Sequence, residues 1–342
     1  MPPSRPLPRK PGYIFLACAA GASYSLVGIA YQLGRGHGLT PQQVMAVGAI
    51  MAAGFFLGKL IRQVNISQSS VVGGQLSVKR GIKGPLRGPA LVWACGILSG
   101  LSQYALLRLF ALGLDLGPLS PVWIAASLGF IPVILFATWR FHERLGGRRL
   151  LAVLAAVACI VLPELVRTPG GRAAGPAGGI MVLYPLVLVL ITLANSIQLG
   201  SIKLLGSLRS GPNGTYMDRH GTLFMFLANA SLALAAAIDL GLTGIPAAPL
   251  PWLSAMGALV GLGSILGISL LSACARGPAA LIFTSSGVSS ILGAALVSVF
   301  FFGESADFGW FIMLGMSILA IMLGASSPPS GRGLNPRKGR MA

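Results

Sequence analysis

The fold of this 342-residue chain is decided by the stretch from residue 117 to residue 163, which reads GPLSPVWIAASLGFIPVILFATWRFHERLGGRRLLAVLAAVACIVLP. An apolar run at 118–139 comes first, a short charged turn that contains Glu143 follows, and a second apolar run continues to Pro163. A helix needs about 20 apolar residues to cross a bilayer, and the first run has that length. The stretch therefore predicts two membrane-spanning helices joined by a charged turn.

The same plan returns near the C-terminus. An apolar run begins at Pro278, a polar turn holds Glu304, and a further apolar run begins at Phe308. The separation from Pro118 to Glu143 is 25 positions, and that from Pro278 to Glu304 is 26 positions. Repetition of one plan at this scale indicates an internal duplication.

The composition excludes a water-soluble domain. Hydrophobic residues make up 54% of the chain and charged residues only 9%, whereas soluble domains carry about 25% charged residues. The net charge of +18 suggests nucleic-acid binding at first sight. The basic residues lie between apolar runs instead of on one domain face, so we expect no nucleic-acid partner. Anionic lipid head groups on the cytoplasmic side are the better partner for these charges.

Ten apolar runs follow one another and predict an all-α polytopic membrane protein. They lie at 13–33, 41–61, 89–110, 118–139, 147–163, 178–202, 221–240, 250–274, 278–302 and 308–324. The runs divide into two five-helix repeats at 12–166 and 178–325, separated by an external linker at 167–177. The polar, basic ends at 1–11 and 326–342 are expected to be disordered cytoplasmic tails.

Charge fixes the expected orientation. With a cytoplasmic N-terminus and ten crossings, 21 of the 25 Lys and Arg residues face the cytoplasm and 4 face outward. This bias is the one that sets topology in membrane proteins. It places both termini and a long loop at 63–88 in the cytoplasm. Because each repeat has an odd number of crossings, the second repeat is inverted relative to the first.

Two windows of the sequence carry a resemblance to a known family. The first holds Pro118, Pro121 and the segment Phe141-His-Glu143-Arg144, and the second holds Gly277-Pro278 and Phe302-Gly-Glu304-Ser305. The chain resembles the drug/metabolite transporter superfamily, EamA-like branch. The resemblance implies a central cavity lined by the first, third, fourth, sixth, eighth and ninth helices. It also implies that Glu143 and Glu304 are structural turn residues; the loop at 63–88 departs from the family's usual short connection.

The acidic residues argue against proton-coupled drug export. All seven lie at predicted helix ends or in loops, whereas ionisable groups at membrane depth usually mark proton or ion relays. The small multidrug resistance branch of the superfamily has a glutamate in its first helix. This chain has Ser23 and Tyr24 in the corresponding part of the run.

Neutral polar residues inside the runs are the candidate substrate-binding residues. They are Tyr24, Tyr31, Gln103, Tyr104, Trp123, Asn195, Gln198, Thr284 and Ser285. The alternative for each is a hydrogen bond between helices, which polar groups in hydrocarbon require. Arg108 is a further candidate as an anion contact, with snorkelling or an ion pair with Asp115 as its alternative.

Other residue patterns bear on chemistry and packing. The four cysteines lie in separate runs and the three histidines in separate loops, so we expect no metal, no cofactor and no enzyme activity. Small residues four apart predict close helix packing. These pairs are Gly54/Gly58, Gly96/Gly100, Gly257/Gly261 and Gly263/Gly267.

The sequence thus predicts a secondary transporter, an exporter or exchanger, in a bacterial inner membrane. It would move a small neutral or weakly polar metabolite by alternating access. The alternatives are a multidrug efflux transporter and a lipid-translocating or scaffold membrane protein. The oligomeric state stays open, with a homodimer among the alternatives.

Overall fold

The structure is a computed structural model that describes residues 12–72, 87–116, 122, 125–143, 145–166, 183–207, 216–244, 247, 249–274, 277–302 and 308–325. Four groups of sequence predictions lie outside these residues. They are the two tails, the linker at 167–177, Trp123 and Glu304.

The described residues form helices and no strand. The helices are α1 (Gly12–Gly36), α2 (Pro41–Val72), α3 (Arg87–Leu116), α5 (Phe130–Phe141), α6 (Gly147–Val166), α7 (Leu183–Ser207), α8 (Tyr216–Thr243), α9 (Leu250–Leu266), α10 (Ile268–Cys274), α11 (Ala279–Phe302) and α12 (Phe308–Ala325).

Six of these helices contain segments long and apolar enough to cross a membrane. The segments are Gly12–Tyr31, Pro41–Gln63, Ala90–Gly113, Leu183–Gly206, His220–Thr243 and Ala279–Val297. Shorter apolar helical segments accompany them at Ala125–Phe141, Leu250–Leu266 and Leu314–Leu323. The chain is therefore an all-helical, membrane-embedded, multi-pass protein, as the composition predicts.

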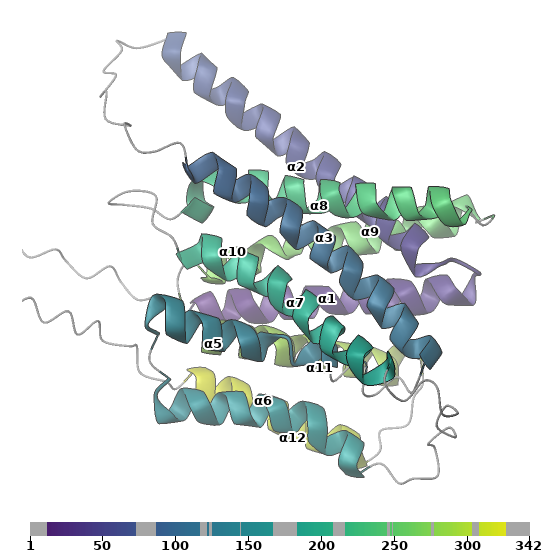
Figure 1. Ribbon diagram of the computed structural model, residues 1–342, viewed down its shortest axis with the longest axis vertical. Helices are drawn as coiled ribbons and strands as arrows, with labels where there is room; N and C mark the ends of the chain where they lie inside the picture. The colour runs from purple at the N-terminus through teal and green to yellow at the C-terminus, as the bar shows by residue number, and fades with distance from the viewer. Residues whose placement is uncertain are drawn as a thin grey trace, which may run out of the picture.

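The helices lie side by side in one elongated bundle (Figure 1). Helices α2, α8 and α9 pack together at one edge, and α6 and α12 pack on each other at the opposite edge. Between the edges, α1 packs on α9, α10 and α11, and α3 packs on α7 and α8. Helix α5 packs on α7 and α11, so the chain's first and second parts are interleaved throughout.

Helix α2 is longer than the sequence predicts. The expected loop at 63–88 begins with helix, because α2 continues to Val72. No glycine or proline interrupts the chain between Lys59 and Val72, and Gly73-Gly74 follows directly. The polarity of this segment suggested a loop, but polar residues do not break a helix in the way that glycine and proline do.

The predicted helix at 118–139 is interrupted. Helix α5 starts only at Phe130, after a turn at Leu128 and Gly129. The backbone N–H of Gly129 donates to Ala126 O at 3.3 Å, and that of Ile131 donates to Leu128 O at 3.0 Å. Proline has no N–H and its ring clashes with the carbonyl four residues earlier, so Pro132 accounts for the break at Leu128.

The small-residue pairs differ in what they pack against. A Cβ added to Gly96 would lie 2.7 Å from Leu227 Cβ on α8, and one added to Gly261 would lie 3.2 Å from Gly48 O on α2. A Cβ added to Gly54 or Gly58 would meet no atom within 4 Å. The prediction of close packing is therefore wrong for the Gly54/Gly58 pair, which faces away from the other described helices.

Candidate functional site

The polar face of α7 holds the interrupted helix in place. Thr192 Oγ1 donates to Ala125 O at 2.9 Å, and Asn195 Nδ2 donates to Ala126 O at 2.5 Å. One residue further along α7, Ser196 Oγ donates to Gly129 O at 2.9 Å. Carbonyls at a helix break need partners wherever water is excluded. These three side chains provide them. For the candidate Asn195, the alternative of a hydrogen bond between helices is therefore observed for its amide N–H.

Other candidate residues lie on α1, α7 and α11. Tyr24 on α1 packs against the core cluster that includes Phe130 of α5. Gln198 lies almost one turn beyond Asn195 on α7 and is buried. On α11, Thr284 and Ser285 are each 1% exposed, and Thr284 Oγ1 has no hydrogen-bond partner among the described residues.

Helices α1 and α11 approach closely enough to bring these residues together. A Cβ added to Gly21 would overlap the carbonyl of Ser286 on α11. One turn further, Ser25 Oγ donates to Ser290 O at 3.2 Å. Helix α11 in turn contacts α5: a Cβ added to Gly287 would lie 3.9 Å from Cδ1 of Phe130, the residue that follows the break.

A second group of candidates lies at the end of the bundle where α3 and α8 end, which we call the Arg108 end. Arg108 Nη1 lies 3.5 Å from Asp239 Oδ2 on α8, and the Tyr104 side chain interacts with the same carboxylate. At 3.5 Å the two groups form an ion pair but no hydrogen bond, because Asp239 Oδ2 has no hydrogen-bond partner among the described residues. The predicted alternative partner, Asp115, is exposed, and Asp239 takes its place.

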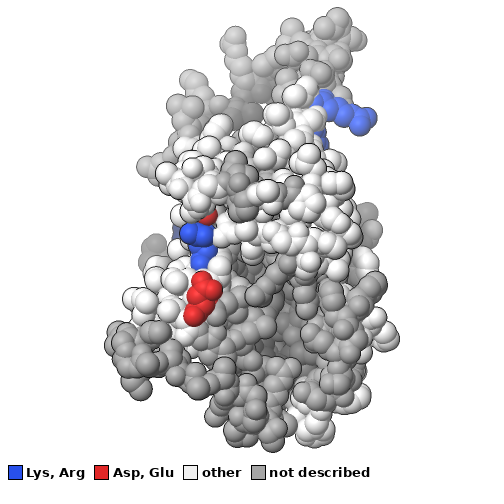
Figure 2. Space-filling model, turned by 90° about the vertical axis from the view of Figure 1, so that its right-hand side faces the viewer, with Lys and Arg blue, Asp and Glu red and all other residues white. Residues whose placement is uncertain are grey.

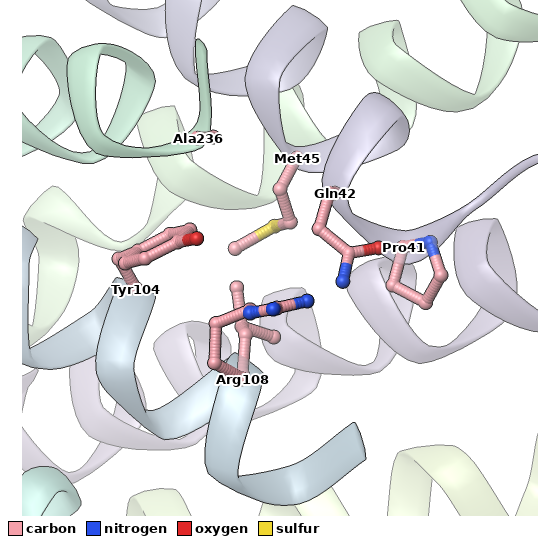
Figure 3. Close-up of a pocket in the computed structure, with 7 residues that line it drawn as sticks. Pro41, Gln42, Met45, Tyr104, Arg108 and Ala236 are labelled. Atoms are coloured by element: carbon pink, nitrogen blue, oxygen red, sulfur yellow. The ribbon is translucent and has the colours of Figure 1, made fainter. Parts of the chain in front are cut away.

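Tyr104 and Arg108 extend from α3 into a small pocket between α2, α3 and α8 (Figure 3). The pocket is lined by Pro41, Gln42, Met45, Tyr104, Leu107, Arg108 and Ala236. It has room for about one water molecule. Figure 2 looks at this end of the bundle and shows a described surface that is mostly uncharged, with a small group of acidic and basic side chains and, apart from it, basic side chains near the top.

Two further candidates lie on α1 and α3. Tyr31 packs against the same apolar cluster as Tyr104, and its buried hydroxyl has no hydrogen-bond partner in the part of the chain that the structure describes. Gln103 is partly buried on α3. The structure therefore divides the sequence candidates into a central group around Gly129 and an outer group near Arg108.

The opposite end, which we call the Glu143 end, holds a charged contact that the sequence interpretation missed. Lys203 Nζ lies 2.7 Å from Glu143 Oε1, and the lysine side chain is only 2% exposed. Glu143 Oε2 accepts a hydrogen bond from the backbone N–H of Ala279 at 2.7 Å. Lys203 Nζ also donates to Gly277 O at 3.2 Å.

These contacts correct two sequence predictions. The sequence places Lys203 just beyond the predicted run at 178–202, but it lies inside α7, four residues before the last residue Ser207. The resemblance implies for Glu143 a structural role in its own turn. Instead it pairs with α7 and satisfies an N–H in the first turn of α11, where a carboxylate is favoured by the helix dipole. A structural role for Glu143 fits this geometry, with partners from other helices.

Comparisons with known proteins identify a fold and no family. The chain matches no protein-family model and no curated protein. It does match 24 chains of solved structures. One of them, described as "Crystal structure of protein", has a TM-score of 0.65 and 16% sequence identity, and the match covers 92% of this chain and 98% of the other. An identity this low shows a shared fold alone.

Proposed function

We propose that this protein is a secondary transporter of ten membrane spans in two inverted five-helix repeats. It moves a small neutral or weakly polar solute by alternating access, in a bacterial inner membrane with both termini cytoplasmic. In this orientation the Glu143 end is cytoplasmic and the Arg108 end is external. The first repeat is α1, α2, α3, α5 and α6; the second is α7, α8, α9 with α10, α11 and α12.

The packing of the helices supports the two repeats. The counterparts are α1 and α7, α2 and α8, α3 and α9, α5 and α11, and α6 and α12. When each helix is replaced by its counterpart, the α1–α11 contact becomes α7–α5, α3–α7 becomes α9–α1, and α2–α9 becomes α8–α3, and each of these contacts is present. The contacts α2–α8, α6–α12 and α5–α11 map onto themselves. All of the most extensive helix contacts follow this exchange. A pseudo-two-fold axis between the repeats explains the pattern.

The sequence positions of matching features support the same exchange. Gly96, Gly100 and Glu143 have counterparts in Gly257, Gly261 and Glu304, each 161 residues later. In the structure, Gly96 and Gly100 pack on α8, and Gly257 and Gly261 pack on α2. The exchange turns the first of these contacts into the second.

One observation carries the proposed site. Helices α1 and α7 both have 25 residues, and Tyr24 and Asn195 are each the thirteenth. The two residues are therefore counterparts at the middle of equivalent helices, and Asn195 lies beside the interrupted segment before α5. Transporters built from inverted repeats bind their solutes near the membrane midplane, at the repeat interface and beside discontinuous helices.

The solute class follows from the groups available. The candidates in the interior of the bundle are the Tyr24 phenol, the Gln198 amide and the α11 hydroxyls of Thr284 and Ser285, all neutral, and Tyr24 packs against the apolar cluster that includes Phe130. The ionisable pairs described above lie at the two ends. A solute with a few hydrogen-bonding groups and no net charge suits such a site.

Flux into proteoliposomes tests the proposal. A panel of neutral and zwitterionic metabolites is screened first by thermal shift and then by uptake. We expect Tyr24→Phe, and the double substitution Asn195→Ala/Gln198→Ala, to lower flux at least about tenfold, a loss of about 1.4 kcal/mol. Thr192→Val is the matched control: it removes a hydrogen bond to the same break from outside the site, and it should retain flux.

Three results would overturn the proposal. Flux at the wild-type rate in both site variants would exclude the central site. Movement of labelled phospholipid without solute flux would favour lipid translocation. Single cysteines at Gly38 and Ala247 that react from the cytoplasm, or one at His142 that reacts from outside, would exclude the orientation.

A further inference from the structure

At the Glu143 end, the carboxylate of one residue connects the two proposed repeats. Glu143 follows α5 in the first repeat, whereas Lys203 on α7 and Ala279 on α11 belong to the second. Both carboxylate oxygens are engaged at 2.7 Å, one by the Lys203 ammonium and one by the Ala279 N–H. Any movement that separates the repeats at this end breaks both contacts together.

Lys203 depends on the first repeat for its charge partner. Phe141, also from the first repeat, places its ring 6.0 Å from Lys203 Nζ, and Gly277 O is the partner from the lysine's own repeat. A buried ammonium that loses its carboxylate is strongly disfavoured as long as water is excluded. The pair therefore stabilises the closed arrangement at this end and is replaced by hydration when the end opens.

Cys274 lies close to this contact in the chain. It is the last residue of α10 and is 2% exposed, and Gly277, whose carbonyl accepts from Lys203, follows three residues later. Cys274 also belongs to the buried apolar cluster against which Tyr24, the proposed midpoint residue, packs.

We propose that Glu143 is the latch of a cytoplasmic gate. Its release from Lys203 and Ala279 opens a path from the cytoplasm past Cys274 to the site at Tyr24. The Arg108–Asp239 pair at the other end is looser, at 3.5 Å with the arginine side chain 45% exposed, so the described state is held more firmly at its Glu143 end. The latch rests on the proposed function, because it gives one end of the bundle a role in alternating access.

Cys274 provides a native reporter for the test. In a chain whose other cysteines, Cys18, Cys95 and Cys159, are replaced by serine or alanine, Cys274 is the only thiol. Its reaction with a membrane-impermeant maleimide is timed in inside-out vesicles. We expect Glu143→Gln to be labelled at least about tenfold faster than the parent. A tenfold change corresponds to a loss of about 1.4 kcal/mol in the free energy that favours the closed state. Lys203→Met breaks the same pair from the other side and should also speed labelling.

Controls separate the latch from general loosening. Asp115→Asn neutralises an exposed carboxylate at the opposite end and should leave the labelling rate unchanged. The swap Glu143→Lys/Lys203→Glu restores opposite charges and should slow labelling again relative to Glu143→Gln. Should Glu143→Gln fail to fold, Lys203→Met and the shortened side chain of Glu143→Asp give the same comparison.

The outcomes distinguish the latch from the proposed function, because labelling requires no solute. Parent-like labelling in folded Glu143→Gln and Lys203→Met protein would overturn the latch while leaving solute flux untouched. Fast labelling in these variants together with no flux for any solute would keep the gate and remove the transport proposal. Labelling of Cys274 only from the external side would overturn both.

Discussion

Two glycine pairs with the same four-residue spacing should respond in opposite ways to alanine. Gly100 on α3 faces α8, where an added Cβ would overlap the Ala228 carbonyl oxygen and the Ser231 hydroxyl. Gly58 on α2 has no atom within 4 Å of the position that a Cβ would take. The structure therefore predicts that Gly100→Ala destabilises the protein and that Gly58→Ala does not.

The magnitude follows from separating two effects. Alanine in a helix interior gains about 0.5–1 kcal/mol over glycine, and this gain is common to both variants. Overpacking a tight interface costs typically about 1–3 kcal/mol, and only Gly100→Ala incurs it. A backbone carbonyl cannot rotate away as a flexible side chain can, so α3 and α8 must separate. The difference in unfolding free energy between the two variants should then be about 1–3 kcal/mol, because the propensity gain cancels.

Thermal unfolding of the purified protein in detergent measures this difference. One kcal/mol corresponds to about 2–4 °C in Tm for proteins of 150–250 residues, so Gly100→Ala should melt about 2–12 °C below Gly58→Ala. Repeating the comparison with Gly96→Ala and Gly54→Ala tests the other member of each pair. Equal Tm values for Gly100→Ala and Gly58→Ala would refute the packing of α3 against α8 described here.

Three further changes have expected outcomes. Thr192→Val removes a hydrogen bond to the helix break and should lower the unfolding free energy by about 0.5–2 kcal/mol, measured by thermal unfolding. Asp239→Asn breaks the pair with the half-exposed Arg108 and should cost at most about 1 kcal/mol, with a smaller effect at high salt; a larger loss would mean that the pair is buried. Gly38 has φ +74°, a backbone conformation that a residue with a Cβ rarely adopts, so Gly38→Ala should lower the unfolding free energy by about 1–2 kcal/mol. Gly36→Ala, in the same turn region, should not lower it, and equal effects would contradict the turn geometry.

The sequence predicts the helices well because their cause is local. Each of the ten apolar runs contains helix among the described residues, since an apolar run in a membrane must satisfy its backbone internally. The interruption before α5 was not predicted, although Pro132 stands in the middle of the predicted helix. The extension of α2 to Val72 was missed because polarity was taken as the sign of a loop.

The contacts between distant helices could not be read from the sequence in the same way. Gly54/Gly58 and Gly96/Gly100 have the same spacing, and only the position of α8 distinguishes them. Lys203 follows an apolar run directly, and the sequence at such a position looks the same whether the lysine is buried in the helix or lies in the next loop. Its partner Glu143 is 60 residues earlier in the chain, so no local rule connects the two.

Most of the described hydrogen bonds between the two proposed repeats are weak contacts of one neutral side chain with the backbone. A side chain from one repeat meets a backbone atom of the other: Asn195 donates to Ala126 O, Ser25 to Ser290 O, and Ser23 to Gly263 O at 3.4 Å. Neutral contacts of this kind in membrane proteins average about 0.6 kcal/mol each, so separating the repeats loses little at any one of them. The Glu143 contact differs, because it combines a buried charge with a backbone N–H. If the proposed latch operates, a variant of Glu143 should therefore change access to Cys274 more than a variant of any neutral contact between the proposed repeats.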